Sequence, residues 1–147
     1  SVLRRGGGRV AVIDRGQCTE YCGLEHARMA VLVVAQDDVA FQRWWAHQLA
    51  APPAPHGAAL TGQQDFQAHC AGCHAVRGSG AAGALGPDLS HLMARSTIAA
   101  GTLPNDAPTL ARWIADPQSF KPGSMMPAPS LSPDELADVN AYLQTLD

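Results

Sequence analysis

Apolar and polar positions follow two different patterns along this chain. In its first third, two runs rich in Val, Ile and Leu at residues 9–13 and 29–35 predict β-strands, and the polar "DRGQ" at residues 14–17 predicts a turn. Residues 37–49 open with two acids and continue with apolar residues near helical spacing, which predicts a short helix. The apolar run at 29–35 is far shorter than the roughly 18 residues of a membrane-spanning helix, so we expect no membrane span here.

The rest of the chain has helical patterns. In "LSPDELADVNAYLQTL", Ser132 is a predicted N-cap, Pro133 takes the first helical position and Glu135 closes a capping box. One face of this final helix is apolar, with Leu136, Val139, Leu143 and Leu146. Further helices are predicted over residues 60–70 and 107–115. A mainly α-helical unit therefore follows a short β segment.

The segment "APPAPHG" at residues 51–57 has three prolines and no periodicity, which predicts an extended, fairly stiff linker. It divides the chain into residues 1–50 and residues 58–147. The first part has six arginines and five acids, whereas the second has four basic residues and eight acids. This balance argues against nucleic-acid binding and suggests two units. Four cysteines also permit two disulfides in a secreted binding module without redox function, and that alternative has to be weighed against their spacing.

"CAGCH" is the C-x-x-C-H sequence of covalent haem attachment. The thiols of Cys70 and Cys73 add to the haem vinyl groups, and His74 lies under the ring as an iron ligand. A thioredoxin-type pair has no need of the histidine and belongs near a βαβ pattern, which is absent here. A zinc site would need a second pair of ligands nearby. We therefore predict a covalent c-type haem.

A six-coordinate electron-transfer haem needs a second axial ligand, usually a methionine. The candidates are Met93, Met125 and Met126. Met93 lies among apolar neighbours in a predicted short helix, so core packing is the better interpretation of it. The loop "KPGSMMPAP", residues 121–129, is far along the chain from His74, as a ligand on the opposite side of the haem should be. Spacing alone does not choose between its two methionines.

Residues 58–147 resemble a class I cytochrome c domain, with the attachment sequence after a first helix, "GPDL" at residues 86–89, a Met-Pro loop and a final helix. The resemblance implies that Met126, directly before a proline, binds the iron. It also implies that the carbonyl of Pro87 supports the axial histidine. Arg95 and Trp113 match positions that often contact the haem propionates, although surface charge and core packing explain them equally well.

The stretch "QCTEYCGLEHARM" brings together soft and borderline ligands that suit copper. They are Cys18, Cys22, His26 and Met29. A mononuclear blue-copper site uses one cysteine, so the second one is surplus to it, whereas two thiolates can bridge two copper ions. A Cys18–Cys22 disulfide is the structural alternative.

This stretch resembles the binuclear CuA loop of cytochrome c oxidase subunit II, which lies on a cupredoxin sandwich. The resemblance implies that Cys18 and Cys22 bridge the two coppers. His26 and the backbone carbonyl of Glu20 would bind one copper, and Met29 the other. The family's site also needs a histidine from an earlier strand, and no histidine precedes His26. We therefore expect the chain to be a fragment whose CuA site is incomplete, with the membrane-anchoring N-terminal helices missing.

A CuA loop followed by a cytochrome c domain resembles the subunit II of bacterial terminal oxidases that carry their own haem. The expected fold is mainly α, a class I cytochrome c fold preceded by a partial cupredoxin-like β segment. The resemblance implies a non-catalytic electron-transfer subunit of a proton-pumping oxidase. An external donor such as a cytochrome c would reduce the haem, and electrons would pass through CuA to oxidase subunit I. Covalent haem and CuA imply the periplasm or the outer face of the bacterial inner membrane.

Two related functions remain open at this point. One is a CuA-bearing subunit of a nitric oxide reductase. The other is a free periplasmic cytochrome c with a metal-free N-terminal remnant, for which the missing histidine is the best support.

Overall fold

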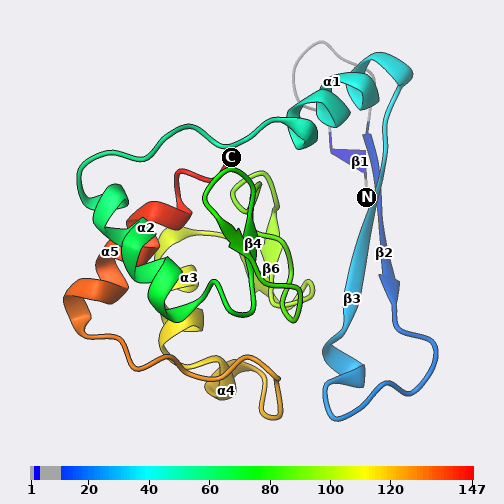
Figure 1. Ribbon diagram of the computed structural model, residues 1–147. Coiled ribbons are helices and arrows are strands. Elements are labelled where there is room, and N and C mark those ends of the chain that lie inside the picture. Colours follow the sequence, from blue (N-terminus) through cyan, green and yellow to red (C-terminus); the bar gives the residue numbers. More distant parts are fainter. Residues whose placement is uncertain (1, 4–10) are drawn as a thin grey trace.

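The computed structural model describes residues 2, 3 and 11–147 (Figure 1). A three-stranded antiparallel sheet in the order β1-β2-β3 opens the chain. Its strands are β1 (Val2–Leu3), β2 (Ala11–Gln17) and β3 (Ala30–Ala35). One 3₁₀ turn, η1 (His26–Arg28), precedes β3, and helix α1 (Asp38–Leu49) follows it. The two predicted strands and the first predicted helix are therefore confirmed over the described residues, whereas residues 9 and 10 of the first predicted strand lie outside them.

The predicted turn at residues 14–17 is wrong. These residues continue β2, and their register runs from Asp14 opposite Val33 to Gln17 opposite Ala30. Cross-strand hydrogen bonding outweighs the turn preference of Asp14 and Gly16, because strand propensity depends on the neighbouring strand. The chain reverses direction only after Gln17, in the segment that contains Cys18 and Cys22.

The remainder of the chain contains four helices and two small antiparallel strand pairs, which is the mainly α arrangement expected from the sequence. Its helices are α2 (Ala58–His69), α3 (Ala107–Ala115), α4 (Pro117–Phe120) and α5 (Pro133–Leu143). The strand pairs are β4 (Ala75–Val76) with β5 (Ala81–Ala82), and β6 (Thr97–Ile98) with β7 (Leu103–Pro104). The predicted fold class is confirmed, while the short helix expected around Met93 is wrong, because that residue lies in a turn.

Helix α5 begins as predicted. The Ser132 side chain accepts a hydrogen bond from the backbone N–H of Glu135, and the Glu135 carboxylate accepts one from the backbone N–H of Ser132. This capping box satisfies two backbone donors that have no partner inside the helix. The helix ends at Leu143, yet Leu146 is still buried because the following turn folds back onto the core.

Helices α2 and α5 pack closely and hold the centre of the core. Gly62 makes this possible, because a Cβ atom there would lie only 1.8 Å from the carbonyl oxygen of Asp138. Next to this contact the rings of Phe66 and Tyr142 meet edge to face, with centroids 5.5 Å apart. Leu110 and Ile114 bring α3 against the same cluster. The packed helices place the end of α2, which carries the C-x-x-C-H sequence, on a rigid support.

No helix in the described part of the chain is long and apolar enough to cross a membrane.

Candidate functional site

The C-x-x-C-H sequence forms a tight turn at the end of α2. The backbone N–H of Cys70 donates to the carbonyl of Phe66, and those of Cys73 and His74 both donate to the carbonyl of Cys70. This turn carries the free thiols of Cys70 and Cys73 and the imidazole of His74 within five residues. Burial, followed by the charge of Cys73, raises the pKa of Cys70 to about 11, so this thiol stays protonated at neutral pH.

The imidazole of His74 is oriented by the backbone of the "GPDL" segment. Its Nδ1 atom lies 2.8 Å from the carbonyl oxygen of Pro87, so Nδ1 carries the proton and donates it. The Nε2 lone pair is then free for a metal. Gly86 lets the segment come this close, because a Cβ atom there would lie 2.5 Å from Cε1 of His74.

The loop at residues 121–129, here called the methionine loop, treats its two methionines differently. Met125 is 96% exposed, whereas Met126 is half-buried. The Gln118 side chain donates hydrogen bonds to the carbonyls of Ser124 (2.8 Å) and Met126 (3.1 Å), and so holds this part of the loop. The third candidate, Met93, packs against the hydrophobic core, as expected from its neighbours.

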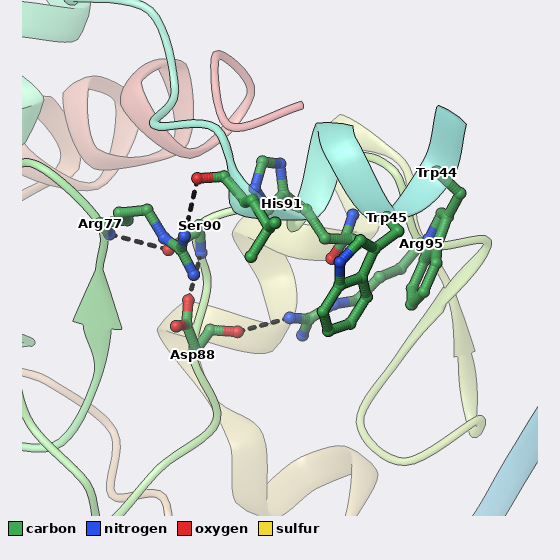
Figure 2. A pocket seen from close by; sticks show the side chains of 9 residues that line it. Trp44, Trp45, Arg77, Asp88, Ser90, His91 and Arg95 are labelled. Carbon is green, nitrogen blue, oxygen red and sulfur yellow. Dashed lines mark hydrogen bonds between the residues drawn. The ribbon is translucent and has the colours of Figure 1, made fainter. Parts of the chain in front are cut away.

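Arg95 and Trp113 lie in different surroundings. Trp113 packs against the core from α3. Arg95 donates to the carbonyl of Asp88 and lines a cavity of about 300 Å³ with Trp44 and Trp45 from α1 (Figure 2). In the described part of the chain, no hydrogen bond joins the Arg95 and Trp113 side chains.

Asp88 holds this cavity's polar wall together. Burial works against its negative charge, but hydrogen bonds from Ser90 and the charges of Arg77 and Arg95 outweigh it and lower the pKa of Asp88. The backbone N–H of Ser90 donates to the Asp88 carboxylate at 2.8 Å. The carboxylate next to Pro87 therefore stays ionised and keeps the "GPDL" segment in place.

The segment at residues 18–29, here called the metal loop, brings its soft ligands together. Sγ of Cys22 lies 3.6 Å from Sγ of Cys18, 3.4 Å from Sδ of Met29 and 3.7 Å from Nδ1 of His26. Sγ of Cys18 also lies 3.1 Å from the carbonyl oxygen of Glu20. Two thiols, an imidazole, a thioether and a carbonyl oxygen thus converge on one point, and this set fits copper better than calcium or magnesium.

The hairpin closes the metal loop at its base. The backbone N–H of Cys18 donates to the carbonyl of Met29 at 3.1 Å, and the Gln17 side chain donates to the carbonyl of His26. The hydrogen bond with Cys18 raises the pKa of the exposed Cys22 thiol. Among the described residues, the cluster that could hold a metal ion contains Cys18, Cys22 and His26 and includes no second histidine.

Comparison with known proteins identifies the second part of the chain. The sequence profile of the cytochrome c family matches residues 59–147. The chain belongs to the cytochrome c family. Cytochrome c of Gossypium barbadense is 35% identical over 103 residues, which cover 62% of this chain and 92% of that protein. The part from α2 to the C-terminus is therefore a cytochrome c domain, and its cofactor is haem c.

Other relatives match the first part as well. Cytochrome c oxidase subunit 2 of Alkalihalophilus pseudofirmus is 38% identical over 137 residues, covering 91% of this chain and 39% of that protein. Cytochrome c oxidase subunit 2 of Bacillus subtilis is 30% identical over 138 residues, covering 89% of this chain and 38% of that protein. The similarity therefore extends over the metal loop and the cytochrome c domain together. The chain spans about two-fifths of the length of these relatives.

The structure also contains residues that sequence analysis missed. Gly83 leaves room for the backbone of Cys73 and His74, Gly86 leaves room for the His74 imidazole, and Gln118 holds the methionine loop. Lys121 is buried beside the metal loop. The sequence contained one indication that Lys121 is unusual, because it is the only lysine in the chain. Gly86 was noted only as part of the "GPDL" segment, and Gly83 and Gln118 had no such indication, because their roles depend on how the chain folds around them.

Proposed function

We propose that this chain carries single electrons from an external donor, through a covalent haem c, to a binuclear copper centre in the subunit II of a bacterial terminal oxidase. In this proposal residues 58–147 form the haem domain, residues 51–57 are a linker and residues 1–50 are the last part of a cupredoxin-like copper domain. The observation that carries it is the presence, in one chain, of a cytochrome c domain and a converging Cys-Cys-His-Met loop.

On the haem side, each residue has a separate task. Cys70 and Cys73 would form the thioether bonds, and Nε2 of His74 would bind the iron. Pro87 holds the imidazole through its carbonyl and thereby selects the required tautomer. Met126 would be the second axial ligand, which its partial burial supports in contrast to the exposed Met125. The haem itself supplies reversible one-electron chemistry when bound.

Two further residues would act at the edge of the haem. We assign Arg95 and Trp113 to the propionates, for which a guanidinium and an indole N–H are suitable hydrogen-bond donors. Arg95 already lies on the polar wall of a cavity with Asp88, where it has a fixed partner. Trp113 lies on α3, and its partial burial leaves it able to pack against the ring system.

On the copper side, Cys18 and Cys22 would bridge two ions. His26 and the carbonyl of Glu20 would complete one ion, and Met29 would bind the other. Their spacing in the structure supports this assignment, because the donor atoms of Cys18, Cys22 and His26 lie within 4.8 Å of one another. Such a copper pair shares one electron over two nuclei, so its geometry changes little on reduction. A further histidine from another segment would have to complete the site, since His26 is the first histidine of this chain.

The partners follow from the same assignment. Electrons would arrive from a soluble or membrane-bound donor such as a cytochrome c and leave toward oxidase subunit I. The chain itself would perform no bond-making chemistry, and oxygen reduction and proton pumping would belong to the other subunits. Covalent haem and a copper thiolate site would put the chain on the periplasmic side or the outer face of the bacterial membrane, and this localisation is part of the proposal. The contact with the donor would be small and transient, as redox encounters generally are.

One observation favours a second candidate function, that of a free periplasmic cytochrome c with a metal-free N-terminal region. It is the lack of a second histidine in the metal-binding cluster of the described residues. A CuA-bearing nitric oxide reductase subunit has no comparable support, because the relatives matching both parts are named cytochrome c oxidase subunit 2.

The deciding experiment is metal and haem analysis of the chain after haem attachment and exposure to copper. We expect one haem and, when imidazole is supplied in place of the missing histidine ligand, two copper ions with an electron paramagnetic resonance spectrum that has hyperfine splitting from two equivalent copper nuclei. A Cys18→Ser variant should lose the copper signal and keep the haem, whereas a Cys70→Ser, Cys73→Ser variant should lose covalent haem only. Wild-type chain that binds haem but no copper even with imidazole present would reject the proposed role in favour of the free cytochrome.

A further inference from the structure

The metal loop and the methionine loop touch each other, although 90 or so residues separate them along the chain. The Arg28 guanidinium donates a 2.8 Å hydrogen bond to the carbonyl of Phe120, directly before the methionine loop. Leu24 packs over Gly123, since a Cβ atom placed at Gly123 would lie 2.8 Å from Cδ1 of Leu24. Figure 1 shows the loop end of the β2–β3 hairpin beside the segment after α4. The two candidate redox sites therefore share an interface.

Lys121 lies at the centre of this interface. It is the only lysine in the chain, and only 7% of its surface is exposed. Its ammonium donates to the carbonyls of Arg28 (3.1 Å) and Ala99 (3.2 Å). Over the described residues, the one ion pair joins His69 and Glu135, so no carboxylate neutralises Lys121. A buried ammonium is costly unless it is hydrogen-bonded, and these two carbonyls therefore hold it in place.

A strained turn supplies the second carbonyl. Ala99 and Ala100, between β6 and β7, have φ angles of 53° and 56°, in the left-handed region that residues with a Cβ rarely adopt. This conformation directs both carbonyls at the interface. Ala99 accepts from Lys121, and Ala100 accepts a 2.9 Å hydrogen bond from the backbone N–H of Ala30. The strain persists because the surrounding contacts determine the turn.

The same contacts reach the candidate ligands on both sides. Arg28 and Ala30 flank Met29, so their hydrogen bonds fix the backbone on either side of a copper ligand. On the other side, the backbone N–H of Ser124 donates to the carbonyl of Lys121, and the Ser124 hydroxyl accepts from the backbone N–H of Met126. Short hydrogen-bonded steps thus connect Lys121 to Met29 and to Met126.

We propose that Lys121 is a positioning residue that locks the metal loop onto the methionine loop, so that the two redox sites keep a constant separation. Its use in electron transfer rests on the function proposed above. In that step the haem held by His74 and Met126 would lose one electron, and the copper pair held by the metal loop would gain it. No proton or further reactant takes part. Because electron tunnelling falls steeply with distance, a loop that moved away would slow this step.

Docking is tested without copper, on the haem-bound chain. Amide hydrogen exchange at Ala30 reports directly on its bond to Ala100. We expect Lys121→Met, which keeps the length of the side chain but removes the donor, to speed this exchange at least about tenfold. Lys121→Arg should restore much of the protection. Arg43→Met removes a cation from an exposed position on α1 and should change nothing.

A second measurement on the same sample is acetylation of Lys121 by an amine-selective reagent. In the wild type it should be at least about tenfold slower than in the denatured chain, because the amine is buried. An unchanged haem spectrum in each variant shows that the cytochrome c domain is folded. Rapid acetylation of the native chain, or equal exchange at Ala30 in wild type and Lys121→Met, would overturn the proposal.

The functional consequence is measured on the chain loaded with haem and copper. After flash reduction of the haem, electron transfer to copper should be about tenfold or more slower in Lys121→Met than in Arg43→Met, because the loop opens when Lys121 no longer holds it. Reduction potentials measured in both variants separate a change in distance from a change in driving force. Protection at Lys121 together with no copper binding in the wild type would support the docking and reject the proposed function. Protection together with equal transfer rates would overturn the positioning role.

Discussion

The Nδ1 atom of His74 lies 2.8 Å from the carbonyl oxygen of Pro87, and this hydrogen bond joins the haem-attachment turn to the "GPDL" segment. It fixes both the tautomer and the orientation of the imidazole. The segment can approach only because Gly86, next to Pro87, has no side chain. The His74–Pro87 hydrogen bond therefore depends on a close approach between two segments. The C-x-x-C-H sequence alone does not specify that approach.

We predict that Gly86→Ala weakens the haem site. The added Cβ would lie 2.5 Å from the imidazole, and overpacking of this kind costs about 1–3 kcal/mol. Denaturant unfolding of the haem-bound chain, followed by haem absorption, measures the change. Gly72→Ala is the matched control, because a Cβ at Gly72 meets nothing within 4 Å. Equal stability of the two variants would contradict the role of Gly86.

Met126→Leu and Met125→Leu should differ in their effect on the haem. Loss of the thioether at Met126 should abolish the methionine-to-iron charge-transfer absorption of the ferric state and lower the reduction potential, because the thioether favours ferrous iron. Met125 is 96% exposed, so its replacement should leave both unchanged. Visible spectra and redox titration decide the matter. The opposite pattern would assign the ligand to Met125.

Without haem, the cytochrome c domain should lose its fixed tertiary structure. A domain of about 90 residues buries little surface of its own, and haem supplies much of the apolar volume of its core. The haem-free chain should therefore keep only part of its helical circular dichroism and lose the near-ultraviolet signal of its buried aromatic residues. Full retention of both signals without haem would show that the protein core alone is sufficient.

The start of α5 should make stability fall in acid. Hydrogen bonds from the backbone and the side chain of Ser132 lower the pKa of Glu135. A carboxyl whose folded pKa is depressed stabilises the fold above its unfolded pKa, and that contribution is lost as pH falls through the folded value. Stability should therefore decline from about pH 4.3 downward.

Glu135→Gln tests this assignment, because the amide keeps a hydrogen-bond acceptor but does not titrate. Thermal unfolding of the haem-bound variant should depend less on pH below about 4.3 than that of the wild type. Ser132→Ala should instead lower stability at every pH, by about 1 kcal/mol, since it removes the N-cap. An identical acid profile for Glu135→Gln and wild type would show that the capping box contributes nothing to the acid response.

Local features were predicted from the sequence with good success. The capping box at Ser132 and Glu135, the short helix over residues 37–49 and the bounds of α3 all depend on residues a few positions apart. The prediction of a turn at residues 14–17 was wrong because the conformation of these residues depends on a strand elsewhere in the chain. The polar residues among them favour a turn in isolation, but β3 offers them a paired strand from more than ten positions away.

The same distinction applies to the candidate sites. Spacing alone pointed to haem attachment at Cys70, Cys73 and His74 and to a soft-metal site between Cys18 and Met29, because each set of ligands is confined to one short segment. The sequence by itself therefore determined which candidate ligands the chain carries and where along the chain they lie. The exposure of Met125 and the partial burial of Met126 became known only from the tertiary structure. So did the burial of Lys121 between two loops. These outcomes depend on packing between segments far apart in the sequence. Such contacts produce no regular spacing of residues from which they could be predicted.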